Sequence, residues 1–297
     1  MPTLDLTGTG VALVTPFKKN AIDYNALSSL IDKVIEGGVE YIVSLGTTGE
    51  ATSLSDDEQT SVIKHTLEAV AGRVPIVAGQ FGGNNTAQLC EKLSSFDTTG
   101  ISAILSSSPA YVKPSQEGIY RHYMELAEAS ALPLIIYNVP SRTASNISAS
   151  TLLRLAKDSK KFIGVKDASA DLHQAAAIAR FAPPHFTLIS GDDPTALSLI
   201  ANGGKGVISV IANGFPESFS TMIRQALSGE WSKARHIHYR LLDLHQWLYI
   251  EGNPVGIKEA LNYKGWCGAE LRLPLVEISD SNRKKLHEAM DAVKGMN

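Results

Sequence analysis

Short apolar runs recur through the first two thirds of the chain and are separated by longer stretches with helical spacing. The runs are rich in Val, Ile and Leu and do not alternate with polar residues, which is typical of strands buried on both faces. Eight such runs predict strands at residues 11–14, 41–45, 75–78, 101–105, 134–137, 162–165, 186–189 and 207–210.

The intervening stretches predict amphipathic helices. Residues 24–36 carry apolar side chains at helical spacing and are followed by two glycines, which end helices readily. The segment 55–58 predicts a capping box, because Ser55 can accept from the backbone N–H of Glu58 while the Glu58 carboxylate reaches back. Further helices are expected over residues 115–131, 149–157, 171–181 and 216–227.

This alternation implies parallel strands joined by helical crossovers. Eight units suggest closure into a (β/α)8 TIM barrel, although an open doubly wound sheet shows the same alternation. Three more helices follow without strands, at residues 230–250, 255–264 and 281–293. We therefore predict a catalytic barrel over residues 1–228 and a small all-helical C-terminal domain over residues 229–297.

Composition narrows the function classes. The 297 residues carry a formal net charge of −3, which gives no sign of a nucleic-acid or anionic-membrane partner. No run approaches the roughly 18 apolar residues of a membrane span. The two cysteines, Cys90 and Cys267, lie far apart, so we expect free thiols and a cytoplasmic location.

No residue pattern points to a cofactor or a metal. The histidines show no zinc-binding motif, and the predicted metal and cofactor content is none. Residues 79–84 are rich in glycine but lack the lysine of a phosphate-binding loop. We predict an ordinary βα loop there.

The active site of a parallel barrel lies at the C-terminal ends of its strands. Lys166 comes directly after the sixth predicted strand, so its amine should be partly desolvated. Desolvation disfavours the ammonium form and makes a lysine nucleophilic toward carbonyls. The alternative is a lysine that forms an ion pair with Asp167 or another carboxylate at the rim.

Four further residues near strand ends suit the same chemistry. Tyr137 ends the fifth run, where a phenol can relay protons, or simply bury its ring. Thr47 and Thr48 occupy a glycine-flanked turn that can hold a carboxylate, or serve as a plain strand-to-helix connection. Arg142 lies in a loop and can bind a second carboxylate, or be a surface charge.

These residues carry a family resemblance that runs from about residue 7 to the end of the chain. The chain resembles the dihydrodipicolinate synthase and N-acetylneuraminate lyase family in the segments 46–50 (GTTGE), 137–143 (YNVPSRT) and 164–169 (GVKDAS). The resemblance implies a class I aldolase-type lyase on a (β/α)8 barrel with C-terminal helices. It is closer to the synthase branch, which condenses pyruvate with L-aspartate-4-semialdehyde on the way to diaminopimelate and lysine.

The resemblance also implies roles for individual residues. Lys166 matches the lysine that forms an imine with pyruvate, and Tyr137 and Thr48 match two members of a proton relay. Tyr111 matches a tyrosine that completes the relay from a neighbouring subunit, so a homodimer is expected, usually doubled into a homotetramer. Thr47, with Thr48, matches the residue that binds the pyruvate carboxylate.

Three more matches concern substrate binding. Arg142 matches the residue that holds the semialdehyde carboxylate at the site entrance. Gly191 and Ile208 match positions whose backbone lines the pyruvate pocket.

Two alternatives and one departure remain. A sister aldolase acting on N-acetylneuraminate or a keto-deoxy sugar acid would share Lys166 and Tyr137, and a catalytically silent binding barrel would keep the fold alone. Some family members are inhibited by lysine through histidine and glutamate side chains. Here Asp56, Gln59 and Gln88 depart from that pattern, which puts lysine inhibition in doubt.

Overall fold

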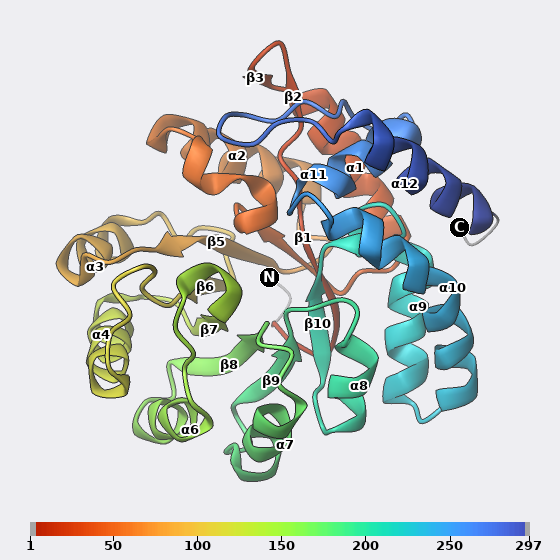
Figure 1. Ribbon diagram of the computed structural model, residues 1–297. Coiled ribbons are helices and arrows are strands. Elements are labelled where there is room, and N and C mark those ends of the chain that lie inside the picture. Colours follow the sequence, from red (N-terminus) through yellow and green to blue (C-terminus); the bar gives the residue numbers. More distant parts are fainter. Residues whose placement is uncertain (1–3, 295–297) are drawn as a thin grey trace.

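The computed structural model describes residues 4–294, and within them eight parallel strands close a barrel. Figure 1 shows the strands at the centre and the helices around them. The strands are β1 (Gly8–Ala12), β4 (Tyr41–Ser44), β5 (Ile76–Gly82), β6 (Ala103–Ser107), β7 (Leu134–Asn138), β8 (Phe162–Asp167), β9 (Thr187–Ser190) and β10 (Gly206–Ser209). The predicted TIM barrel is confirmed and the open sheet is excluded, because β10 pairs with β1.

The outer helices follow the strands in chain order. They are α1 (Tyr24–Glu36), α2 (Asp56–Val70), α3 (Thr86–Ser95), α4 (Gln116–Ala129), α6 (Ala149–Asp158), α7 (Leu172–Phe181), α8 (Ala196–Ala201) and α9 (Pro216–Leu227). The predicted capping box is present: the Glu58 N–H donates to Ser55 Oγ at 3.2 Å, and the Ser55 N–H donates to Glu58 Oε2 at 3.0 Å. Both groups lie within one turn, so local sequence alone specifies this helix start.

The glycine-rich segment was predicted wrongly as a loop, since β5 continues through Gly82. The register between β5 and β6 shifts between Ala78 and Phe81, and β5 continues to pair with β6 beyond this irregularity, as far as Gly82. Helix α3 then begins with Asn85 as its N-cap, whose side chain accepts from the Gln88 N–H at 3.2 Å.

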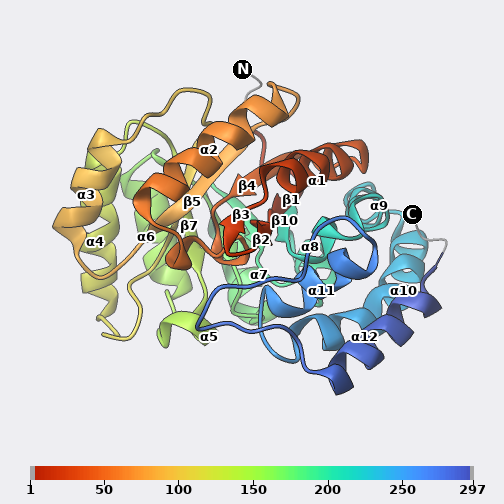
Figure 2. The same cartoon turned by 90° about the horizontal axis from the view of Figure 1, so that it is seen from above.

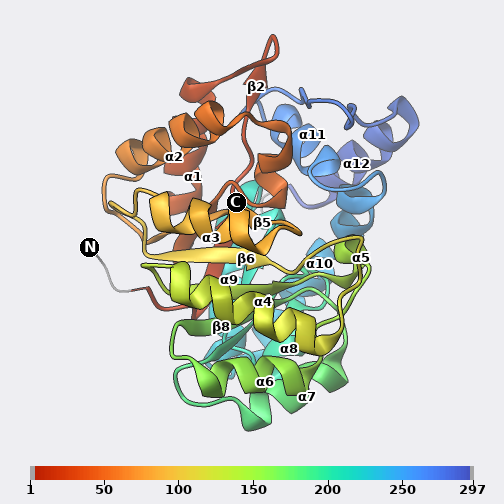
Figure 3. The same ribbon diagram turned by 90° about the vertical axis from the view of Figure 1, so that its left-hand side faces the viewer.

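The C-terminal helices are α10 (Trp231–Tyr249), α11 (Val255–Tyr263) and α12 (Asp280–Ala292). Figures 2 and 3 show the three helices packed together at one side of the molecule. Helix α11 contacts η3 (Ile211–Asn213), the turn that directly follows β10. Because η3 leaves the C-terminal end of a barrel strand, these helices flank the mouth of the barrel, where the short helix α5 (Pro140–Thr143) follows β7. The division of the chain at residue 229 stays a prediction, and its outer ends, residues 1–3 and 295–297, lie outside the described residues.

A short hairpin and three 3-10 turns complete the mouth. The hairpin of β2 (Phe17–Lys18) and β3 (Ala21–Ile22) follows β1. Two 3-10 turns, η1 (Thr47–Gly49) and η2 (Ala51–Ser53), follow β4, and η3 (Ile211–Asn213) follows β10. None of the described helices is long and apolar enough to cross a membrane.

Candidate active site

Lys166 projects from β8 into the barrel and is buried, with 5% of its surface exposed. We predicted that Lys166 directly follows the strand. The strand in fact extends one residue beyond it, so Lys166 lies within β8. It pairs with Tyr137 on β7 and with Ile189 on β9. Neighbouring residues in register point to the same side of a sheet, which brings the amine and the phenol together.

The contact between the two side chains is direct. The Lys166 Nζ lies 4.4 Å from the centroid of the Tyr137 ring, within the range in which a ring face attracts a cation. Tyr137 is itself buried, with 8% exposed. The buried amine therefore lies beside a phenol, a side chain that can move protons in imine chemistry.

The alternative ion pair with Asp167 is not formed. Successive strand residues face opposite sides, and the Asp167 carboxylate accepts hydrogen bonds from Asn138 Nδ2 at 3.1 Å and from the Ser169 N–H at 3.0 Å. Among residues 4–294, no carboxylate lies within ion-pair distance of the Lys166 amine. The amine is therefore not engaged in a structural salt bridge.

Gly191 packs against the stem of Lys166. A Cβ at Gly191 would lie 3.0 Å from Lys166 Cγ, 3.0 Å from Lys166 Cε and 2.8 Å from Ala168 Cβ. The Gly191 N–H also donates to the Asp167 carbonyl at 2.7 Å. Sequence reasoning placed the Gly191 backbone at the pocket but missed that a side chain there would press on the lysine.

The threonine turn lies at the end of β4. Thr48 is buried at 2% exposure, and its hydroxyl accepts a hydrogen bond from Asn253 Nδ2 at 2.9 Å. Thr47 is exposed. Within the described residues, the Tyr137 hydroxyl makes no hydrogen bond to either threonine, so the single chain does not by itself assemble the expected relay.

The other predicted residues take distinct positions. Ile208 is buried in β10, with 1% exposed, and Arg142 is exposed on α5 at the rim. Tyr111 is 88% exposed and has a positive φ of 71°, a conformation that bulky residues seldom adopt. Its N–H donates to the Thr143 carbonyl at 3.1 Å, which holds the loop in place.

Asp193, which follows β9, links the end of β10 to the C-terminal helices. One carboxylate oxygen accepts from the backbone N–H groups of Val210 at 2.9 Å and Ile211 at 2.8 Å, and from the Tyr249 hydroxyl at 2.7 Å. Burial, with Asp193 adding to it, raises the pKa of Tyr249. This phenol therefore stays protonated as a donor that fixes the rim beside Ile208.

Comparison with known proteins agrees with this geometry. Residues 5–293 match the model of the dihydrodipicolinate synthetase family. The chain belongs to this family. The 4-hydroxy-tetrahydrodipicolinate synthases of Flavobacterium psychrophilum and Parabacteroides distasonis are 49% and 45% identical to it, over 94% and 98% of this chain and 96% and 98% of theirs.

A solved member of the dihydrodipicolinate synthetase family shares the fold closely. The chloride-inhibited dihydrodipicolinate synthase of Acinetobacter baumannii, complexed with pyruvate, superposes with a TM-score of 0.93 at 38% identity. The match covers 97% of this chain and 99% of that one. The family assignment therefore rests on near full-length similarity in both sequence and structure.

The residues that depart from the lysine-inhibited pattern of the family come together in one groove. Asp56, Gln59 and Gln88 line a space of about 890 Å³ between α2 and α3, together with Asn84. Lys92 also lines it, and its amine donates to Gln59 Oε1 at 3.1 Å. The groove therefore carries charges of both signs, since Glu91 and Asp97 line it as well.

Proposed function

We propose that this chain is a pyruvate-dependent lyase that carries out the reaction of a 4-hydroxy-tetrahydrodipicolinate synthase. It joins pyruvate to L-aspartate-4-semialdehyde. The observation that carries the proposal is the buried amine of Lys166 against the Tyr137 ring, free of any ion pair in the described chain. The names of its full-length relatives support the same reaction.

The chemistry begins at Lys166. Its neutral amine adds to the ketone carbon of pyruvate, and loss of water gives an imine. The imine draws electrons from the methyl carbon, which loses a proton and becomes the nucleophilic end of an enamine. That carbon attacks the aldehyde of the semialdehyde and forms the new carbon–carbon bond. The amino group of the semialdehyde then displaces Lys166 as the ring closes.

Proton transfers in these steps need a hydroxyl near the amine. Tyr137 occupies that position, and Thr47 or Thr48 can extend the relay once substrate oxygen atoms bridge the gap. The exposed Thr47 is better placed to meet substrate than Thr48, whose hydroxyl already accepts from Asn253. Both threonines belong to the proposed carboxylate site for pyruvate.

Arg142 and Tyr111 extend the proposal beyond the pocket. The exposed guanidinium of Arg142 at the rim suits the carboxylate of the semialdehyde. The strained, outward-facing Tyr111 suits insertion into the site of a second copy, so we propose a homodimer that doubles into a tetramer. Both free cysteines suit a reducing compartment, and a cytoplasmic location is part of the proposal.

Borohydride reduction in the presence of pyruvate tests the central step. The parent chain should gain the mass of one reduced pyruvyl group on the peptide that carries Lys166, and a Lys166→Met variant should not. Turnover is then measured with pyruvate and the semialdehyde, coupled to a reductase and NADPH. A mass gain with activity only toward N-acetylneuraminate would assign a sister aldolase, and no mass gain would refute the proposal.

A further inference from the structure

The threonine turn is bracketed by two non-glycine residues in the left-handed conformation. Leu45 has φ 59° and Glu50 has φ 52°, and both are buried. Such a conformation persists in ordinary residues only where the surroundings enforce it, and it gathers at functional sites. The contacts of Glu50 show what enforces it here.

Glu50 forms a fully buried ion pair with Lys258 of α11. The Lys258 amine lies 2.5 Å from Glu50 Oε1, and the two side chains are 0% and 1% exposed. The same amine donates to the Glu270 carbonyl at 2.9 Å and lies 4.0 Å from the centroid of the Phe17 ring. Residue 50 is thus tied to a helix 208 positions later in the chain.

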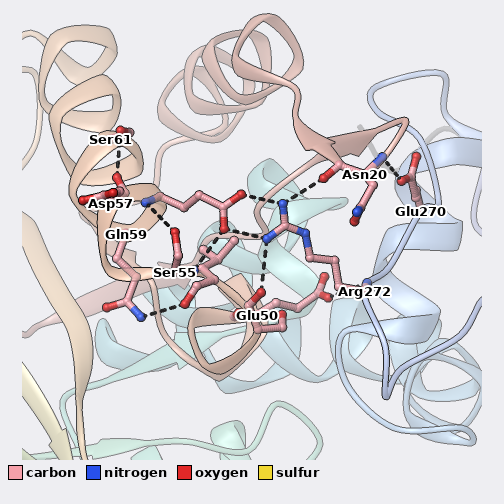
Figure 4. Close-up of polar contacts among 11 residues, drawn as sticks. Asn20, Glu50, Ser55, Asp57, Gln59, Ser61, Glu270 and Arg272 are labelled. Carbon is pink, nitrogen blue, oxygen red and sulfur yellow. Dashed lines mark hydrogen bonds and ion pairs between the residues drawn. The ribbon is translucent and has the colours of Figure 1, made fainter.

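The segment around residue 272 contacts the second carboxylate oxygen of Glu50. The Arg272 N–H donates to Glu50 Oε2 at 3.3 Å. Its guanidinium donates to both carboxylate oxygens of Glu58, at 2.7 and 2.6 Å, and to the Ser53 carbonyl at 3.1 Å. Figure 4 shows Arg272 reaching from the C-terminal segment to the start of α2, with Glu50 beside it.

A third contact, a hydrogen bond, is made with the threonine turn itself. Asn253, in the connection before α11, donates to the Thr48 hydroxyl at 2.9 Å. Three contacts from the C-terminal helical layer therefore act on this turn: one at its middle residue, Thr48, and two at Glu50, which directly follows it. The contacts with Thr48 and Glu50 therefore link the C-terminal helices to the candidate site.

A buried ion pair is a poor way to gain stability. Taking both charges out of water costs about as much as their attraction returns, and neutral replacements of similar volume are often neutral or stabilising. What such a pair offers is a single allowed orientation. Burial lowers the pKa of Lys258, and the Glu50 carboxylate opposes that change, so removing one partner alone leaves a buried charge unsatisfied.

We propose that Glu50 and Lys258 are positioning residues that orient the threonine turn for the pyruvate carboxylate, so that the C-terminal helical layer sets the geometry of the active site. This inference rests on the proposed function. It predicts that losing the pair weakens binding of pyruvate while the fold survives.

The deciding variant replaces both partners, Glu50→Gln with Lys258→Met, so that no unpaired charge stays buried. The matched control is Glu40→Gln, which removes the charge of a carboxylate at the opposite end of β4 that pairs with Arg224 and accepts from the Thr9 N–H at 2.6 Å. A Glu50→Asp variant keeps the charge but draws it back by one methylene. Each is measured for thermal midpoint, for KM of both substrates and for the rate of borohydride trapping.

We expect the double variant to raise KM for pyruvate about tenfold, and to slow trapping at subsaturating pyruvate, with KM for the semialdehyde changed much less. Glu40→Gln keeps the parent KM values, and Glu50→Asp falls between. A loss of folded enzyme lowers the maximal rate but leaves KM unchanged, so KM separates positioning from stability.

A pyruvate KM within twofold of the parent in the double variant would overturn the inference, and the pair would then only stabilise the fold. Should the double variant fail to fold, Glu50→Asp decides in the same way: a raised KM supports positioning and an unchanged KM refutes it. If the parent traps no pyruvate on Lys166, the proposed function itself fails, which is a distinct result.

Discussion

Replacing Gly191 by alanine adds one methyl group beside the stem of Lys166. That methyl would sit 3.0 Å from two lysine carbons and 2.8 Å from Ala168 Cβ, whereas carbon atoms in van der Waals contact lie about 3.5–4.0 Å apart. The lysine must therefore move by roughly 0.5–1 Å. Overpacking of this kind costs about 1–3 kcal/mol of stability, and a misplacement of about 1 Å can slow a reaction by roughly a hundredfold.

The assay is the rate of borohydride-trapped imine at fixed pyruvate, read beside the thermal midpoint. We expect Gly191→Ala to slow trapping by about 10- to 100-fold and to lower the midpoint by a few degrees. Two controls separate the effects. Gly118→Ala meets its nearest atoms at 3.4 Å, so it should leave the trapping rate unchanged and, because it lies in α4, raise the midpoint slightly. Gly204→Ala collides with Leu199 and should lower the midpoint alone.

One result would refute the reasoning. If Gly191→Ala traps pyruvate at the parent rate, the stem of Lys166 does not depend on the open space at position 191. A slowed rate in Gly204→Ala would equally show that lost stability, and not the position of the lysine, governs trapping.

Three further outcomes are expected. Thr47→Val should reduce kcat by at least tenfold and more than Thr48→Val, because the Thr48 hydroxyl is already engaged; equal losses would contradict this. Arg272 lowers the pKa of Glu58 to about 2, below its unfolded value near 4.5. The stability that this ion pair contributes is therefore present above about pH 4.5 and lost as the pH falls toward 2. Glu58→Gln should flatten that part of the curve of thermal midpoint against pH, and an unchanged curve would show that the pair contributes no stability. L-Lysine at millimolar concentration should leave activity unchanged, because Gln59 and Gln88 carry no charge and the Gln59 amide oxygen already accepts from Lys92. Inhibition that a change of Gln88 relieves would show the opposite.

Most helices and strands could be predicted from the sequence because they depend on short-range patterns of residues. The bounds of α1 and α9 agree with the apolar spacing and the residues that follow each helix. The capping box at Ser55 joins residues three positions apart. Helix α3 and the extension of β5 through Gly82 were both missed. The extension passes a register shift against β6, and only the neighbouring strand determines that shift.

The candidate chemistry divides in the same way. The rule that active sites lie at strand ends, and the family resemblance, single out Lys166 and Tyr137 from sequence. Lys258 carried a weaker signal, since it stands beside Glu259 in an otherwise uncharged and mostly apolar stretch at residues 255–261 (VGIKEAL). The structure buries that whole stretch in α11. Nothing local indicated that its partner would be a glutamate following β4.

The order of strands and helices, the helix caps and the candidate nucleophile were therefore determined by the sequence itself, because periodicity and capping act over a few residues. The closed barrel decided three contacts: the close packing of Gly191 against the Lys166 stem, the hydrogen bond from Asn253 to Thr48, and the ion pair of Glu50 with Lys258. These contacts span 25 to 208 positions in the chain, and only closure of the barrel and docking of the C-terminal helices bring their atoms within reach.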